Sequence, residues 1–217
     1  QRRCPLADSV ILRQVLMVES PSAPGTFLRS LTCDWLPHAT KFTLLYRGSR
    51  DGSHAKAFHA ACDDKGPTLT LVHAHGDGDE PIIVGGYTQV SWQSPSPGCK
   101  RFHDDAAFVF RVIFDPVTRA ASGGWYPIRP ACAENAIYCG SGMGPTFSLD
   151  LSVAADTMAM RATDRFVVFV SMGPQDGRGA LDDSSYGFED ETLREQHGVV
   201  HFSYYNFIEE IEVFGVS

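Results

Sequence analysis

Residues 41–86 read KFTLLYRGSRDGSHAKAFHAACDDKGPTLTLVHAHGDGDEPIIVGG, and this stretch decides the fold. The apolar run at 42–46 predicts a strand, and residues 48–52 after it, bounded by glycines, predict a polar turn. Three apolar side chains then recur at the spacing of a short helix: Ala55, Phe58 and Cys62. The first half of the stretch therefore predicts a strand, a turn and a helix with one apolar face.

The second half of the stretch predicts a hairpin beside that helix. Gly66 and Pro67 end the helix, because neither residue continues a helical turn. Residues 68–74 then alternate with the period of a strand, and after a loop of Gly and Asp a second strand returns at 82–87. A helix held against a hairpin is a unit that can bury an apolar face.

The rest of the chain adds more strands than helices. Residues 1–8 are a polar lead-in, and apolar residues at helical spacing predict a helix that Pro37 ends. Further strands are predicted at residues 108–114, 149–153, 165–170, 199–207 and 208–216. Residues 172–198 are rich in Gly, Asp and Glu and predict an acidic surface insertion. Many strands with few helices are typical of an α+β fold.

The composition restricts the classes of function. The chain has 217 residues, 43% of them hydrophobic, and a net charge of −8. Such a charge argues against nucleic acid or an anionic membrane as a partner bound through bulk charge. No run approaches the roughly 18 to 20 apolar residues of a membrane span. We therefore expect no nucleic-acid partner, no transmembrane segment and no cofactor.

Cysteine usage points to a reducing compartment. The six cysteines are scattered and contain no CxxC pair, so neither a disulfide scaffold nor a zinc site of that type is expected. We therefore expect an intracellular protein, cytosolic or associated with a large assembly. The chain begins at Gln1 without an apolar leader, and we expect it to be part of a longer protein.

Six motifs resemble those of the TLDc domain, the domain of the oxidation-resistance proteins. They are LLYRGSRDG at 44–52, AFHAACDDKGPTLT at 57–70, GGYTQVSW at 85–92, IYCG at 137–140, GPTF at 144–147 and IEEIEVFG at 208–215. The resemblance implies two antiparallel β-sheets packed as a sandwich with short flanking helices. It also implies a single domain over residues 9–217. Relatives usually carry a His-Asp pair after GPTF, and residues 148–150 read Ser-Leu-Asp here, so no role of that histidine is carried over.

The resemblance implies a non-enzymatic protein-interaction domain. It also implies a role in oxidative-stress resistance and binding of the vacuolar proton pump (V-ATPase), as in several relatives. Two alternatives stay open, a structural component of a large assembly and a thiol-based antioxidant enzyme. Binding of phosphoinositide head groups needs a cluster of Arg and Lys on one face, which the sequence alone does not reveal.

Charged residues are the candidates for binding a partner. Around the opening turn they are Arg47, Arg50, Asp51 and Lys65, and in the acidic insertion they are Asp182, Asp183, Glu189, Asp190 and Glu191. The alternative for the first group is local: Asp51 and the glycines shape the turn, and the cations hydrogen-bond nearby groups. Near the C-terminus, Glu209, Glu210 and Glu212 are expected on a solvated or edge-protecting face.

Two further kinds of site are weaker hypotheses. Cys139 and Cys62 are candidate redox thiols, but both lie in apolar surroundings that favour packing. A metal site is a weak alternative for His73, His75 and Asp77, at a strand end where polar residues in solvent are normal. The glycines at 140–144 precede a strand and not a helix, so they do not predict a phosphate loop.

Overall fold

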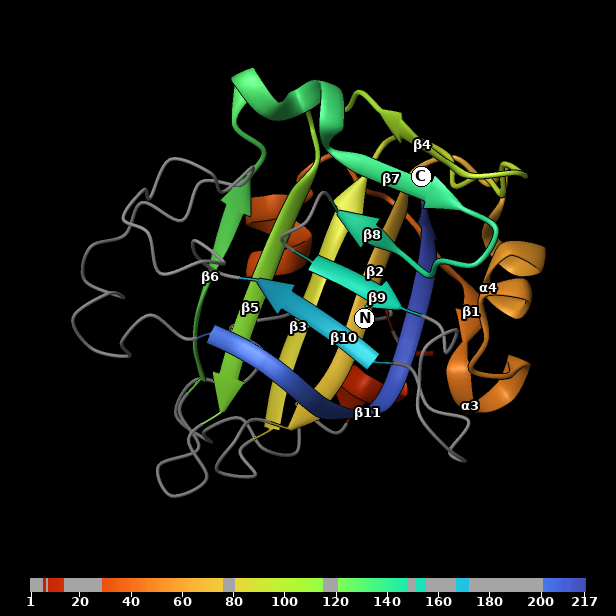
Figure 1. Ribbon diagram of the computed structural model, residues 1–217. Coiled ribbons are helices and arrows are strands. Elements are labelled where there is room, and N and C mark those ends of the chain that lie inside the picture. Colours follow the sequence, from red (N-terminus) through yellow and green to blue (C-terminus); the bar gives the residue numbers. More distant parts are fainter. Residues whose placement is uncertain are drawn as a thin grey trace.

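One long strand, β11 (His201–Val216), joins the two layers of the computed structural model (Figure 1). The structure describes residues 6, 8–13, 29–75, 81–114, 121–147, 151–154, 167–171 and 201–217. The first half of β11 pairs with β10 (Val167–Ser171), and its second half lies between β2 (Thr68–His75) and β1 (Phe42–Arg47). The sequence predicted two closing strands where the structure has one continuous strand.

The strands form two antiparallel sheets that share β11. The first sheet has the order β1-β11-β2-β3-β5-β6, and the second has the order β4-β7-β8-β9-β10-β11. The remaining strands are β3 (Pro81–Thr88), β4 (Cys99–Phe102), β5 (Phe108–Phe114), β6 (Ala121–Pro127), β7 (Ile137–Gly140), β8 (Thr146–Phe147) and β9 (Leu151–Ala154). The strands of the second sheet cross over those of the first (Figure 1). The sequence pattern predicted an α+β fold, and the family resemblance implied this two-sheet sandwich.

An aromatic cluster fills the space between the sheets. Trp92 is fully buried, and its ring lies 5.6 Å from the rings of both Phe58 and Phe147. The indole nitrogen of Trp92 donates to Thr68 Oγ1 at 2.8 Å, so its polar atom is satisfied as well. A Cβ at Gly86 of β3 would lie 2.7 Å from the Phe147 ring. The glycine therefore allows the two layers to approach closely.

The outer face of the first sheet is also covered. Leu69 and Phe110 on this face belong to a second apolar cluster with Ile11 and Leu31 from the N-terminal part of the chain. Strands β2 and β3 are consequently buried at successive positions, as is usual for a sheet with two covered faces.

Short helices complete the layers. They are η1 (Ser30–Trp35, a π-helix), α3 (Gly48–Asp51), α4 (Ala55–Cys62) and η2 (Pro130–Asn135, a 3-10 helix). Helix α4 has the predicted apolar face, but it ends at Cys62, before the stop predicted at Gly66 and Pro67. Helix α3 stands where the sequence predicted a turn, and η2 was not predicted. None of the described helices has the length and the hydropathy needed to cross a bilayer.

Candidate functional site

A cationic groove of about 480 Å³ runs along strand β1. Its lining side chains include four cations and one carboxylate: Arg13, Lys41, Arg47, Arg50 and Asp8. Residues 42–44 of β1 complete the lining. Because the chain as a whole has a net charge of −8, this excess of positive charge is a local feature of the surface.

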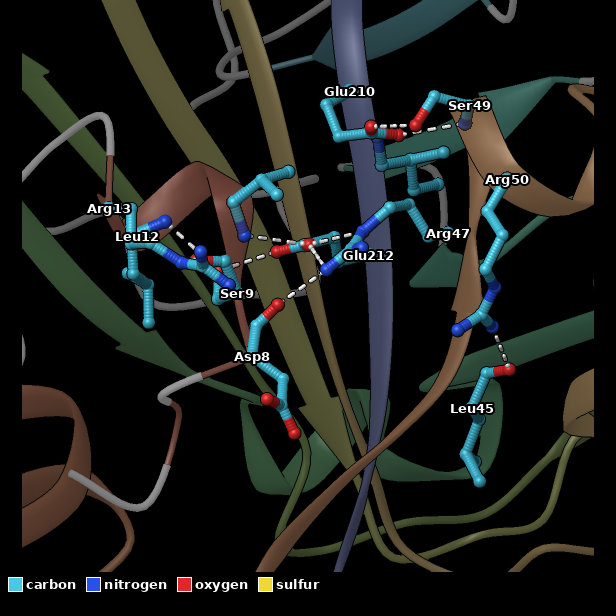
Figure 2. Close-up of polar contacts among 12 residues, drawn as sticks. Asp8, Ser9, Leu12, Arg13, Leu45, Arg47, Ser49, Arg50, Glu210 and Glu212 are labelled. Carbon is cyan, nitrogen blue, oxygen red and sulfur yellow. Dashed lines mark hydrogen bonds and ion pairs between the residues drawn. The ribbon is translucent and has the colours of Figure 1, made fainter. Parts of the chain in front are cut away.

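Arg47 lines this groove, and its side chain contacts the buried carboxylate of Glu212 (Figure 2). They are register partners in β1 and β11, and Arg47 Nε donates to Glu212 Oε1 at 2.8 Å. The Nη2 atom of Arg47 also lies 2.8 Å from the same carboxylate oxygen. The carboxylate of Glu212 is fully buried, so this ion pair fixes the position of the Arg47 side chain.

The same carboxylate holds the N-terminal segment on the sheet. Ser9 Oγ donates to Glu212 Oε2 at 2.5 Å, and the Val10 amide donates to Oε1 at 3.0 Å. Arg47 Nη2 also donates to the Asp8 carbonyl. Ser9 Oγ accepts from the Leu12 amide at 2.9 Å, which caps the helical turn that carries Arg13. Glu212 therefore fixes the chain segment that supplies Arg13 to the groove.

A second buried glutamate anchors helix α3. Glu210 accepts from Ser49 Oγ at 2.5 Å and from the Ser49 amide at 3.1 Å. Gly48 makes this approach possible, because a Cβ there would lie 2.8 Å from Ile211 Cγ2. The expectation that Glu210 and Glu212 lie on a solvated face is therefore wrong. Their hydroxyl, amide and guanidinium partners supply the hydrogen bonds that compensate for their removal from water.

Glu209, in contrast, is exposed at the bulge of the same strand. Its Oε2 lies 3.1 Å from Nδ1 of His73, which is itself buried. His73 therefore has a structural position in the interior, one of the two roles, structural or solvated, that were expected for it.

Arg50 closes one end of the groove. Its Nη2 donates to the Leu45 carbonyl at 3.0 Å and to Asp51 Oδ2 at 2.7 Å (Figure 2 shows the bond to Leu45). The hydrogen bond from Arg50 lowers the pKa of Asp51, and the same bond raises the pKa of Arg50. Leu45 lies at the point where the β1–β11 register shifts, so Arg50 binds the carbonyl where regular pairing is interrupted.

The outer edge of β1 faces away from β11. Lys41 and Ser217 exchange two backbone hydrogen bonds, of 2.8 and 3.0 Å. In an antiparallel ladder the alternate residues then point their N–H and C=O groups outward, and in β1 these are Phe42 and Leu44. Within the part of the chain that the structure describes, β1 pairs with no strand other than β11.

The structure gathers only part of the predicted partner-binding set. Arg47 and Arg50 line the groove, Asp51 pairs with Arg50, and Lys65 is exposed after α4 and does not line it. The acidic candidates at 182–191 lie outside the described residues. Arg13, Lys41 and Asp8 were not predicted, because no local pattern connects Lys41 with the segment that carries Asp8 and Arg13.

The candidate redox thiols lie in the interior. Cys62 has no exposed surface and Cys139 is 1% exposed. Burial is the main reason that the pKa of both thiols is raised, to about 11 for Cys139. Burial of this kind opposes formation of the reactive thiolate.

A buried histidine links α4 to the second sheet. His59 Nδ1 lies 2.7 Å from Asp63 Oδ1, and its Nε2 lies 2.9 Å from the Gly140 carbonyl.

The described residues contain no group of three His, Cys, Asp or Glu side chains arranged to hold a metal ion. Asp77, one of the three candidates for a metal site, lies outside them, as does the side chain of His75.

Comparison with models of protein families gives a match over most of the chain. The family model described as the TLDc domain matches residues 30–217. No curated protein matches the chain. Asp8 and Arg13 precede the matched residues, so one wall of the groove comes from outside the family match.

Proposed function

The chain belongs to the TLDc domain family, and on this basis we propose that it is a non-enzymatic protein-interaction domain. The observation that supports this proposal is the cationic groove along β1. It combines positive charge, the outward backbone of an edge strand and a wall fixed by a buried ion pair. These are features of a surface that receives another chain.

The rigidity of the groove favours binding. Arg47 makes its contacts with Glu212 and Asp8 inside the domain, so its side chain needs little further ordering when a partner arrives. Arg13 and Lys41 are exposed and remain able to contact a partner. The groove thus combines a preorganised wall with cations in solvent.

For the partner we propose the cytosolic sector of the vacuolar proton pump, V-ATPase, and for the role a contribution to oxidative-stress resistance. The family resemblance supports both. An intracellular location in contact with that sector follows from the proposal.

Binding of the purified cytosolic sector to the immobilised 217-residue protein tests the proposed function. We expect saturable binding that weakens as salt is raised, because exposed charge pairs are screened by salt. A heat-unfolded sample of the same protein is the control for non-specific adsorption. Absence of saturable binding by the folded protein would contradict the proposed partner.

A further inference from the structure

We propose that the outer edge of β1 binds an acidic, extended segment of a partner protein as an added strand. This inference rests on the proposed function and names the chemistry of the partner. The segment would hydrogen-bond to the backbone of Phe42 and Leu44, and its carboxylates would contact Arg13 and Lys41.

The outer edge of β1 offers backbone groups that an added strand could pair with. Phe42 and Leu44 direct their N–H and C=O groups away from β11, and no hydrogen bond joins these groups to another described residue. Both residues line the groove together with Thr43, which is exposed. An extended peptide can satisfy such groups by strand addition, which supplies affinity through main-chain hydrogen bonds.

The charges beside this edge favour an acidic segment. Within the described residues, Arg13 makes one side-chain hydrogen bond, from Nε to the Ser9 carbonyl at 3.3 Å, and Lys41 makes none. Both side chains are exposed, and both line the groove. Carboxylates spaced along a strand are therefore the complementary ligand for these two cations.

The ends of the groove limit the register. Arg50 already donates a hydrogen bond to the Leu45 carbonyl, at the shift in the β1–β11 pairing. At the other end Lys41 and Thr40 both donate to the Ser217 carbonyl, so their N–H groups point toward β11. The added strand is thus confined to residues 42–44, which makes the site short and dependent on charge for its affinity.

The charge also selects among occupants of this edge. A second copy of the chain paired through β1 would bring its own Arg13 and Lys41 against the same cations, and like charges oppose that contact. An anionic lipid surface would meet the cations but offers no backbone to pair with Phe42 and Leu44. An acidic strand satisfies both requirements.

The test uses fluorescence anisotropy with a fluorescein-labelled peptide in which Glu and Val alternate. In an extended peptide every Glu then lies on one face. We expect saturable binding by the 217-residue protein and none of the matched peptide in which Gln replaces Glu. The double variant Arg13→Gln/Lys41→Gln should bind on the order of tenfold more weakly, because each exposed charge pair contributes modestly. Lys100→Gln, on exposed β4 outside the groove, is the matched control and should bind as the wild type does.

Peptides with a modified backbone distinguish strand addition from simple charge attraction. They require no change in the protein. One peptide carries N-methyl groups on the Val backbone nitrogens and a second carries them on the Glu backbone nitrogens. Because alternate residues of an added strand donate to its neighbour, at least one of these peptides should lose binding. Equal binding of both N-methylated peptides and the parent would overturn the proposal.

Two other outcomes would also overturn it. One is binding of the wild type to vesicles of phosphatidylcholine and phosphatidylserine, with no binding of the Glu-Val peptide. The other is a dimer at the concentrations used, with no peptide binding. If the cytosolic sector binds the wild type and the Arg13→Gln/Lys41→Gln variant equally, the inference fails while the proposed function stands. If the sector does not bind the wild type, the proposed partner fails whatever the peptide does.

Discussion

Arg47 and Glu212 lie opposite each other in β1 and β11, and their side chains form an ion pair with an N–O distance of 2.8 Å. The Glu212 carboxylate also accepts hydrogen bonds from Ser9 and Val10, near the other end of the chain. A single buried carboxylate thus connects the edge strand, the closing strand and the N-terminal segment. This contact shapes the groove.

Removing Glu212 should strongly destabilise the protein. Glu212→Ala leaves the buried Ser9 hydroxyl and the partly buried Arg47 guanidinium without the carboxylate that they contact. We expect the free energy of unfolding to fall by about 3–5 kcal/mol, as for other broken buried ion pairs. Urea unfolding followed by circular dichroism measures this loss.

The matched control is Glu209→Ala on the same strand. The Glu209 side chain is 47% exposed, and its Oε2 lies 3.1 Å from His73 Nδ1. We expect a loss below about 1 kcal/mol. Equal losses of unfolding free energy for the two variants would contradict the claim that the buried contacts of Glu212 stabilise the fold more than the exposed contact of Glu209.

Contact between the layers at Gly86 and Phe147 gives a second prediction. A Cβ at Gly86 would lie 2.7 Å from the Phe147 ring, so Gly86→Ala should destabilise the protein by about 1–3 kcal/mol through overpacking. In the background of Phe147→Leu the same change should have a smaller effect, because the ring that it meets is gone. A double-mutant cycle measures the coupling energy. Strict additivity of the two changes would contradict the proposed contact between the sheets.

The cysteines should differ in reactivity toward iodoacetamide. At about pH 8, below the ordinary pKa of a cysteine, Cys33 and Cys99 should be alkylated first because both are exposed. Cys62 and Cys139 are buried, and burial raises their pKa, so they should react only after unfolding in urea. Mass spectrometry of peptides identifies the modified sites. Alkylation of Cys139 as fast as Cys99 in the folded protein would instead favour the thiol-enzyme alternative.

Stability should fall in alkaline solution. In the unfolded chain Cys139 ionises near its ordinary pKa of 9.0, whereas burial in the folded protein raises that pKa to about 11. Between these values the unfolded state releases a proton that the folded state retains, so rising pH favours unfolding. Burial raises the pKa of Cys62 and Tyr46 as well, and both act in the same direction.

Urea midpoints measured in steps from about pH 8 to about pH 10.5 test this prediction, with up to about 1.4 kcal/mol lost per pH unit for each group. Cys139→Ala should show a shallower decline than the wild type. A wild-type urea midpoint that stays constant across this pH range would contradict the claim that burial raises the pKa of these thiols.

Local pattern was sufficient to predict several elements of the fold. Strand β5 (Phe108–Phe114) has the predicted bounds, and helix α4 (Ala55–Cys62) has the predicted apolar face, because each carries its own periodicity. The TLDc resemblance predicted the two-sheet sandwich, and periodicity alone would not have done so. Helix α3 was missed because four residues are too few to show a helical period.

The groove could not be predicted in the same way. Ser9 and Glu212 are separated by 203 positions, so neither local sequence indicates that the two side chains form a buried hydrogen bond. Taken alone, charged residues between apolar ones at a strand end indicate a solvated face. The proximity of Arg13 and Lys41 could not be predicted either, because only the packing of the N-terminal segment on the first sheet brings them to one surface.

The most direct test of the central claim is binding of the vacuolar proton pump's cytosolic sector to charge-reversed protein. Arg13→Glu/Lys41→Glu is compared with Lys100→Glu, after urea melts have shown that both variants are folded. If the β1 groove is the interaction surface, the first variant loses binding and the second binds as the wild type does. Undiminished binding by Arg13→Glu/Lys41→Glu would contradict the account.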